Sequence, residues 1–456
     1  MTQVELHFFG AAGTVTGSKF LLETSEMNIL IDCGMFQGLK ELRLQNWDVF
    51  PFPPEKIDLV LLTHGHFDHV GYLPKLRQQG FEGPIIGSSP TMAVASVVLL
   101  DSAKIQEEDA ERANEEGYSK HHPAKPFYTV EDAERVISYF KTEEPDKWIK
   151  ISENISCRFR KNGHIIGATF IELDVFGKRF VFSGDIGRKQ DVLLDPPQKP
   201  EWADFLIMES TYGDKLHPNE DADEVLQKTI MDTLEKRGTL IIPSFAVERL
   251  QTLMVSLWRL YHAKKIPNIP VFIDSPMGNR VLSIFAQYPE WHKLSKTEMS
   301  AMQRHFNIIS SYAETWKTID NPRPKVVIAG SGMVTGGRVL TYLKYYIDKP
   351  ETTVLLVGFQ AEGTRGRMLL EGAKELKIQG KYYSVKATVK DIQSLSAHAD
   401  QHGLLEWTDS IKNFPENVFL VHGEPEALQE LSKKLSEKNW KVTIPDLQDK
   451  ITLSRK

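Results

Sequence analysis

The sequence predicts an α/β fold in which a β-rich part of the chain is interrupted by a βα insert. Short strand-like runs separated by glycine turns fill the first third of the chain, as at 4–9 and 28–32. From about Tyr212 the pattern changes to near-continuous apolar strands that alternate with helices, which is typical of a parallel sheet covered on both faces. The length of 456 residues favours one large composite domain or two to three smaller ones.

The β-rich part is expected to form two β layers. A long helix is expected over 89–112, because a proline follows a serine cap at its start and charged residues then fill one face. Glycines bound the first apolar runs and mark them as strands that end in turns. The expected strands of this part lie at 4–9, 19–23, 28–32, 57–63, 155–159, 168–175, 179–183 and 205–209.

The insert is expected to hold its own sheet. Its expected helices lie at 220–236, 247–262, 278–287 and 339–347, and its strands at 239–242, 271–273, 325–329 and 353–357. The last stretch, with strands at 382–392 and 417–421 and helices at 401–411 and 425–437, fits either sheet. Since no Gly/Ser or proline-rich linker is visible, the domain borders are placed where the pattern changes, giving 1–209, 210–375 and 376–456.

Composition and hydropathy argue against a disordered chain, a fibre and a transmembrane protein. Hydrophobic residues make up 41% and charged residues 25%, which is ordinary for a globular chain. The longest apolar stretch, 92–100, is far shorter than the ~18 to 20 residues of a membrane span. No secretory signal pattern is visible, so a cytoplasmic location is expected. The 55 basic and 61 acidic side chains give a net charge of −6, so a polyanionic substrate would need a local positive site.

The strongest chemical signal is the run 63–69, Thr-His-Gly-His-Phe-Asp-His, which directly follows an apolar strand. Imidazole and carboxylate are zinc ligands. Its four candidate ligands, His64, His66, Asp68 and His69, lie on one turn and can reach two neighbouring metal positions. Two ions ~3.5 to 4 Å apart can clamp the attacking and leaving oxygens of a displacement. The alternative, a polar surface turn, is disfavoured by the strand-to-turn context.

The chain's two cysteines, Cys33 and Cys157, lack the paired spacing of a structural zinc site. Any metal is therefore expected to be held by histidine and carboxylate side chains. Fourteen histidines, the one unusual count in the composition, leave enough candidates for such a site.

Through its ligand run the chain resembles the metallo-β-lactamase superfamily, whose signature is His-x-His-x-Asp-His and whose fold is a β-sandwich flanked by helices. Asp32 at a strand end, His164 in Asn-Gly-His-Ile-Ile-Gly and Asp185 in Ser-Gly-Asp-Ile-Gly match further positions of that superfamily. The resemblance implies that Asp32 supports the ligand turn. It also implies one ion held by His64, His66 and His164 and another held by Asp68, His69 and His422, with Asp185 shared.

The insert extends the resemblance to the β-CASP nucleases, which carry such an insert as a cap over the metal cleft. Glu209 in Met-Glu-Ser-Thr-Tyr-Gly, His398 in Ser-Ala-His-Ala-Asp and His422 in Val-His-Gly-Glu fit the three motifs of that family. Histidine at the third motif is the form of the RNA-processing members. The resemblance implies a two-zinc ribonuclease, with manganese as the alternative ion, that cuts single-stranded RNA between its two domains. The attacking group would be a metal-bound hydroxide.

The candidate catalytic residues are Asp68, Asp185, Glu209 and His398. His398 fits a general acid for the leaving oxygen if Glu209 orients the ring and raises its pKa; the alternative is a helix-cap neighbour without chemistry. The glycine-rich turn at 330–337 lies between a strand and a helix, where backbone N–H groups can receive a phosphate, although such turns are as often plain structure. The candidate substrate contacts are Arg249, Ser331, Gly332, Arg338, Arg365 and Arg367.

Two other classes of function stay open at this point. A two-zinc hydrolase of small esters or lactams would use the same ligands, but the insert is then an unnecessary addition. A noncatalytic scaffold would have lost metal ligands, and the intact ligand set speaks against it. The sequence leaves open whether cleavage is internal or proceeds from the 5′ end, and the resemblance is compatible with a homodimer.

Overall fold

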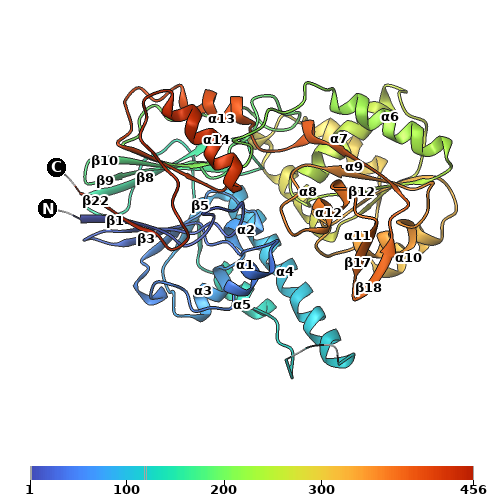
Figure 1. Ribbon diagram of the computed structural model, residues 1–456, viewed down its shortest axis with the longest axis horizontal. Coiled ribbons are helices and arrows are strands. Elements are labelled where there is room, and N and C mark those ends of the chain that lie inside the picture. The colour runs from blue at the N-terminus through green and yellow to red at the C-terminus, as the bar shows by residue number, and fades with distance from the viewer. Residues whose placement is uncertain (1–2, 118, 120, 455–456) are drawn as a thin grey trace. The chain divides into compact units, whose positions relative to one another are not determined.

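The structure is a computed structural model that describes residues 3–117, 119 and 121–454 (Figure 1). The described residues form two compact units. The sandwich unit comprises 3–37, 41–216 and 398–454, and the insert unit comprises 38–40 and 217–397. The domain borders expected at 209/210 and 375/376 do not coincide with the ends of these units and stay a proposal. Among the described residues, no helix combines the length and apolar character needed to cross a membrane.

The sandwich unit contains two seven-stranded sheets, one with the strand order β22-β1-β2-β3-β4-β5-β6 and the other with the order β21-β20-β11-β10-β9-β8-β7. The first sheet consists of β1 (Gln3–Phe8), β2 (Phe20–Glu23), β3 (Asn28–Ile31), β4 (Leu59–Leu61), β5 (Ile85–Ser88), β6 (Phe140–Glu143) and β22 (Lys450–Ser454). The second consists of β7 (Ile149–Lys150), β8 (Ile155–Lys161), β9 (Thr169–Val175), β10 (Lys178–Phe182), β11 (Phe205–Glu209), β20 (Asn417–Val421) and β21 (Val442–Thr443).

Helices flank these sheets. They are α1 (Lys40–Gln45), whose first residue groups with the insert unit, η1 (Pro54–Lys56), α2 (Phe67–Val70), α3 (Leu73–Gln78), α4 (Ser89–Glu115), α5 (Val130–Ile137), α13 (Gln401–Thr408) and α14 (Pro425–Ser436). Helix α4 begins as expected, because the hydroxyl of Ser88 accepts a hydrogen bond from the N–H of Thr91 and a proline occupies the first turn.

Apolar side chains between the two sheets form the main core. Phe8 and Ile31 of the first sheet and Phe159 and Phe182 of the second are at most 1% exposed. A second cluster lies between the second sheet and helices α13 and α14, centred on Trp407. Helix α4 packs against β5 and β6 of the first sheet. This helix–sheet–sheet–helix layering confirms the predicted sandwich.

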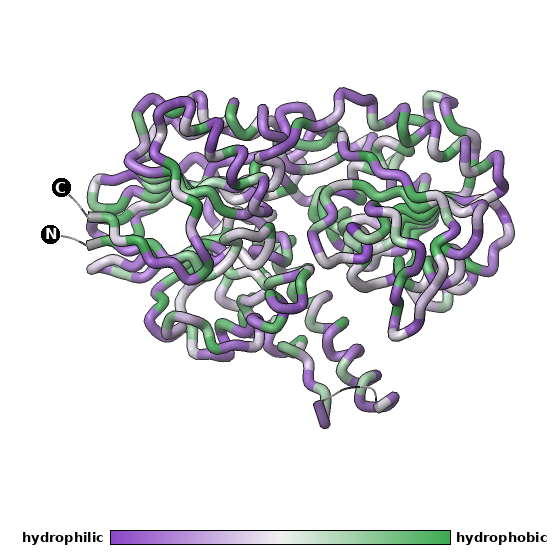
Figure 2. The backbone as a smooth tube through the Cα atoms, viewed as in Figure 1, coloured by the Kyte–Doolittle hydropathy of each residue, from purple (hydrophilic) through white to green (hydrophobic). Residues whose placement is uncertain are grey.

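The insert unit is built around a six-stranded sheet with the order β14-β13-β15-β12-β16-β19. Every neighbouring pair in it is parallel, which confirms the predicted parallel sheet. Its strands are β12 (Thr239–Pro243), β13 (Val271–Asp274), β14 (Asn307–Ile308), β15 (Lys325–Ala329), β16 (Thr353–Val357) and β19 (Thr388–Ile392). The apolar strands stand out at the centre of this unit in Figure 2, with hydrophilic segments around them.

The remaining elements of the insert unit surround that sheet. They are α6 (Ala222–Glu235), α7 (Arg249–His262), α8 (Pro276–Gln287), η2 (Pro289–Trp291), α9 (Lys296–His305), α10 (Tyr312–Asp320), α11 (Val339–Tyr346), α12 (Arg365–Leu370), β17 (Glu375–Ile378), β18 (Lys381–Ser384) and η3 (Gln393–Leu395). The single strand expected over 382–392 is wrong. It divides into β18, which forms a hairpin with β17, and β19, which joins the parallel sheet. The break falls where the N–H groups of Lys386 and Ala387 both donate to the carbonyl of Ile347.

Candidate metal centre

The ligand run begins just after β4, at the end of a buried strand of the first sheet. The backbone N–H and the hydroxyl of Thr63 donate to the two carboxylate oxygens of Asp32, at 2.8 and 2.7 Å. These bonds fix the direction of the chain as it leaves the strand. The short helix α2 then turns the chain so that Asp68 and His69 lie near His64. His64 is fully buried and His69 is 2% exposed.

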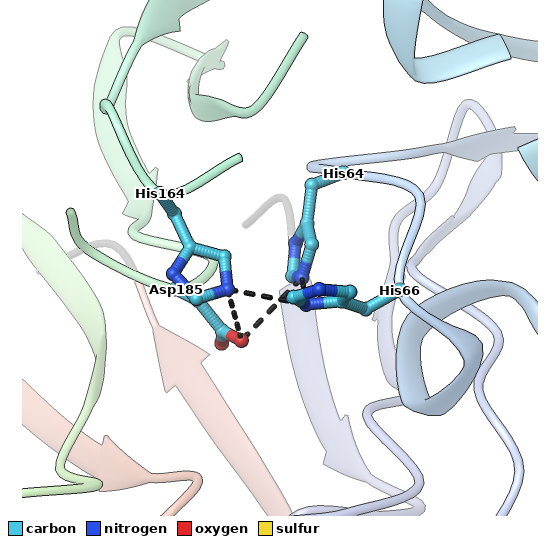
Figure 3. Close-up of side chains that lie close together, drawn as sticks. All are labelled: His64, His66, His164 and Asp185. Atoms are coloured by element: carbon cyan, nitrogen blue, oxygen red, sulfur yellow. Dashed lines mark hydrogen bonds and ion pairs between the residues drawn. The ribbon is translucent and has the colours of Figure 1, made fainter. Parts of the chain in front are cut away.

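One donor group consists of His64, His66, His164 and Asp185. Nδ1 of His66 lies 3.1 Å from Nε2 of His64 and 3.1 Å from Nε2 of His164. Oδ2 of Asp185 lies 3.4 Å from the Nε2 atoms of both His64 and His164. Figure 3 shows the three rings and the carboxylate pointing toward one another, with His64 and His66 on one segment of the sandwich unit and His164 and Asp185 on others.

The second donor group consists of Asp68, His69 and His422. Nε2 of His422 lies 3.3 Å from Oδ2 of Asp68 and 3.4 Å from Nε2 of His69. The other carboxylate oxygen of Asp185, Oδ1, lies 3.3 Å from Nε2 of His69. Asp185 therefore presents one oxygen to each group, which is the arrangement that the resemblance implied.

The spacing of these donors fits a divalent cation. A tetrahedral zinc ion holds nitrogen and oxygen donors at about 2.0 to 2.1 Å, so that neighbouring donors lie ~3.3 Å from one another. The donor pairs given above lie 3.1 to 3.4 Å apart, and Oδ2 of Asp68 lies 3.9 Å from Nε2 of His69. Oδ1 of Asp185 is buried and, within the part of the chain that the structure describes, accepts no hydrogen bond. Such an oxygen is a free acceptor for a cation.

The protonation state of the first group favours the same conclusion. Burial lowers the pKa of His64 to about 3 and that of His66 to about 4. Burial also lowers the pKa of His164 well below its usual value. These imidazoles are therefore neutral near pH 7 and keep the lone pair that a metal ligand needs.

Three candidate ligand histidines, whose Nε2 atoms lie among the donors, each have a partner side chain at Nδ1; Nδ1 of His422 also lies 3.7 Å from Oδ1 of Asp185. Nδ1 of His69 lies 2.7 Å from Asp32, Nδ1 of His64 lies 3.1 Å from the hydroxyl of Thr63, and Nδ1 of His422 lies 3.2 Å from the hydroxyl of Thr211. Such partners fix the tautomer and the orientation of a metal-ligating ring. The structure thus places Asp32 beside a ligand, where the sequence predicted it.

Sequence reasoning missed Thr63 and Thr211 as partners of ligands, and it also missed Asn162. The amide nitrogen of Asn162 donates to the carbonyls of Ser183 and Asp185, at 2.9 and 2.7 Å, and so holds the turn that carries the shared carboxylate. Asn162 is fully buried. Its place two residues before His164 was the one signal in the sequence that pointed to it.

Glu209 and His398 lie next to the first donor group. Nδ1 of His398 lies 3.2 Å from Oε1 of Glu209, and the ring centroids of His398 and His164 are 4.5 Å apart. Oε2 of Glu209 accepts the N–H of Thr211, which holds the carboxylate in place. Burial lowers the pKa of His398, but the carboxylates of Glu209, Asp185 and Asp68 together raise it above its usual value.

The predicted substrate contacts all lie in the insert unit and have protein partners. Nη1 of Arg338 lies 3.4 Å from Asp274, and its guanidinium stacks on Tyr312. Arg365 donates to the carbonyls of residues 334, 335 and 377, and Arg367 pairs with Glu371. Arg249 is buried, and the hydroxyl of Ser331 accepts two N–H groups of its own turn. Gly332 lies against Phe245. Their contact with substrate stays a prediction.

Two further groups combine histidine and carboxylate: Asp185 with Glu209 and His398, described above, and the group of Glu5, His7 and Glu23 on β1 and β2. The ammonium of Lys450 pairs with Glu5 and lies 3.9 Å from Glu23. A lysine therefore already supplies the positive charge in this last group, which distinguishes it from the two donor groups that share Asp185.

Comparisons with known proteins agree with this geometry. Residues 13–240 match the metallo-beta-lactamase superfamily, residues 250–369 match the Beta-Casp domain, and residues 382–445 match the Zn-dependent metallo-hydrolase RNA specificity domain. Ribonuclease TTHA0252 from Thermus thermophilus is 34% identical over 96% of this chain and 97% of its own length. Transcription termination factor FttA from Methanosarcina mazei is 32% identical over 95% of this chain and 69% of its own length.

One solved structure adds support for the fold alone. A protein of unknown function from Enterococcus faecalis V583 aligns over 99% of this chain and 100% of its own, with a TM-score of 0.55 and 12% identity. The sandwich and its two donor groups define a metal-dependent hydrolase of the metallo-β-lactamase type. Within that superfamily, the chain belongs to the β-CASP family. The resemblance recognised in the sequence is therefore confirmed.

Proposed function

We propose that the protein is a two-zinc ribonuclease that hydrolyses phosphodiester bonds of single-stranded RNA. The observation that carries this proposal is the pair of donor groups that share Asp185, with the Glu209–His398 pair beside them. A phosphodiester is anionic, and its sugar oxygen is a poor leaving group. Its hydrolysis therefore needs positive charge and a proton donor in one place; the two donor groups would hold ions that supply the charge, and His398 would supply the proton.

The donor groups define which residues would hold each ion. His64, His66 and His164 would hold one zinc ion, and Asp68, His69 and His422 the other, with Asp185 between them; manganese is the alternative ion. When bound, the ions supply Lewis acidity toward the phosphate oxygens and lower the pKa of water. The chain contributes rigidity, because Asp32, Thr63 and Thr211 hold three of the ligand rings.

His398 is the proton donor in this proposal. With Nδ1–H donating to Glu209, the proton on Nε2 is the one that can be released. The carboxylate raises the pKa of His398, so the ring is protonated at a higher pH than a free imidazole. Its proton passes to the leaving 3′ oxygen, while Glu209 keeps the ring in one orientation.

RNA is the favoured substrate for two reasons. Residues 382–445 match an RNA specificity domain, and the relative at 34% identity is named a ribonuclease. His422 also holds the third-motif position at which, by the resemblance to the β-CASP nucleases, the RNA-processing members carry histidine. A cytoplasmic location and a homodimer belong to the same proposal, and light scattering on the purified chain tests the second.

The test uses purified, zinc-loaded protein and 5′-labelled single-stranded RNAs with free or blocked ends. The lengths of the products distinguish internal cleavage from stepwise removal at the 5′ end. H398A is expected to lose cleavage and keep its metal. H402A is the matched control, because His402 is an exposed histidine on α13 in the same segment, and it is expected to cleave like the wild type. Full activity in H398A would overturn the assigned proton donor.

The two other classes are weaker candidates. A hydrolase of small esters or lactams predicts turnover of nitrocefin or a thioester, and such turnover without RNA cleavage would favour it. A noncatalytic scaffold predicts fewer than two ions per chain. The complete ligand set speaks against that class, because each of the seven ligand side chains lies in one of the two donor groups.

A further inference from the structure

Lys19 is a buried lysine outside the donor groups. It is 4% exposed, and its ammonium donates to the carbonyls of Gly17 and Gly34 at 3.0 and 2.7 Å. The same nitrogen lies 4.2 Å from the ring centroid of Phe36 and 5.3 Å from that of Tyr72. Two carbonyl oxygens and two aromatic rings therefore surround the ammonium, and both kinds of group are favourable partners for a buried cation.

Both loops that Lys19 joins are bound to the ligand turn. The N–H of Ser18 donates to the carbonyl of Asp68 at 2.8 Å, and the N–H of Cys33 donates to the carbonyl of His69 at 2.7 Å. The N–H of Gly34 donates back to the carbonyl of Ser18 at 3.0 Å. These bonds connect the two loops to each other and to the backbone of two ligands.

Gly34 shows how closely these segments pack. A side chain at this position would place its Cβ atom 1.5 Å from the carbonyl oxygen of Asp68. The loop therefore lies directly against the backbone of a ligand, and its carbonyl is one of the two that the Lys19 ammonium binds. A shift of this loop would be transmitted to Asp68.

The side chains next to the two joined carbonyls also touch a ligand. The hydroxyl of Ser18 lies 3.2 Å from Nε2 of His69, and Asp32 lies 2.7 Å from Nδ1 of the same ring. Asp32 thus holds His69 at Nδ1, and Ser18 lies beside the Nε2 that would face the ion; both residues are within two positions of the Lys19 contacts. His66 and His164 are reached by none of these bonds.

We propose that Lys19 is a positioning residue for the donor group of Asp68, His69 and His422, and that it acts by holding the two loops behind those ligands. The inference rests on the two-ion centre of the proposed function and goes beyond it, because it assigns the support of one ion to a residue that touches no ligand. Without the ammonium, two carbonyls lose their donor and the loops can shift. The ion of this group is then held more weakly, while the ion of His64, His66 and His164, which the loops reach only through Asp32 and Thr63, is affected less.

The test is calorimetric titration of the metal-free chain with zinc, followed by cobalt absorption spectra that report the coordination of each ion. Wild type is expected to bind two ions per chain. In K19M, binding of one ion is expected to weaken by about 10- to 100-fold, the range seen when partners of metal ligands are removed. The other ion should lose clearly less affinity, because the loops reach its ligands only through Asp32 and Thr63. K19R, which restores donors and charge, is expected to recover part of the loss.

K325M is the matched control. Lys325 is 2% exposed, donates to the carbonyl of Asn321 and lies 5.3 Å over the ring of Tyr346, but it belongs to the insert unit. Burial lowers the pKa of both lysines to about 8. K325M therefore removes an equivalent buried amine and is expected to bind two ions like the wild type.

The remaining outcomes distinguish failure of the Lys19 inference from failure of the two-ion centre on which it rests. Two ions of wild-type affinity in K19M would overturn the inference and leave the proposed function intact. Equal weakening of both ions in K19M and in K325M would also overturn it, because that result indicates general destabilisation. A wild-type chain that binds fewer than two ions would overturn the two-ion centre itself. If K19M does not fold by circular dichroism, K19Q replaces it and its titration is judged by the same criteria.

Discussion

Replacement of His398 by alanine is expected to slow RNA cleavage by about 10²- to 10⁴-fold, the range for loss of one general acid. This corresponds to about 3 to 5 kcal/mol of lost transition-state stabilisation. The structure supports a loss in kcat, because His398 contacts Glu209 and the ring of His164 and is not one of the seven proposed ligands, although with Asp185 and Glu209 it forms a further group whose atoms are close enough to hold a cation. Zinc content should therefore stay at the wild-type value.

The leaving group makes this prediction specific. A proton donor greatly accelerates cleavage when the leaving group is a sugar oxygen, which is a poor leaving group. It accelerates cleavage much less when the leaving group is p-nitrophenolate, which departs without being protonated. Cleavage of an RNA oligonucleotide and of a p-nitrophenyl phosphodiester is measured with wild type, H398A and the exposed-site control H402A. H398A should lose far more activity on RNA than on the p-nitrophenyl ester. An equal loss on both substrates would refute the acid role and indicate that His398 positions a ligand or the substrate.

Further predictions concern metal and stability. Zinc should raise the free energy of unfolding by about 1.4 kcal/mol for each tenfold excess of free zinc over its Kd, since only the folded chain brings the donors together; an unchanged melting curve after chelation would contradict this. W407A should destabilise the sandwich unit by about 3 to 5 kcal/mol in urea, because this buried ring packs edge-on against Phe170 and donates to the carbonyl of Gln198. Burial lowers the pKa of Lys19 from 10.5 to about 8, so between these values the unfolded chain binds more protons and stability rises with pH. The free energy of unfolding of K19M should therefore rise by about 1 to 3 kcal/mol less than that of the wild type over this pH range. Parallel curves of unfolding free energy against pH for the two proteins would exclude the lowered pKa of Lys19.

The core of the candidate site could be predicted because its chemistry is concentrated in short, distinctive runs. The ligand run at 63–69 follows a strand, and strand ends are where the structure places Asp32 and His422 as well. Both of these residues adopt left-handed backbone, with φ of 57° and 50°. That conformation changes the direction of the chain at the end of each strand, and the residue types alone do not predict it.

The supporting contacts were harder to predict, because they depend on tertiary packing and not on residue type. Thr211, Asn162 and Ser18 are ordinary polar residues in sequence, and they become partners of ligands only when distant segments meet. The sequence analysis missed helices such as α9 and α10, although each begins with a capping box. In a short, polar segment this signature is difficult to notice. The arginines chosen for phosphate have internal partners that only the folded chain reveals.

The most direct test of the two-ion centre is a crystal structure of the zinc-loaded protein with anomalous data collected at the zinc edge. The account predicts two anomalous peaks per chain. One should lie among His64, His66 and His164, the other among Asp68, His69 and His422, each within coordination distance of Asp185. A single peak, or peaks outside these donor groups, would contradict the account.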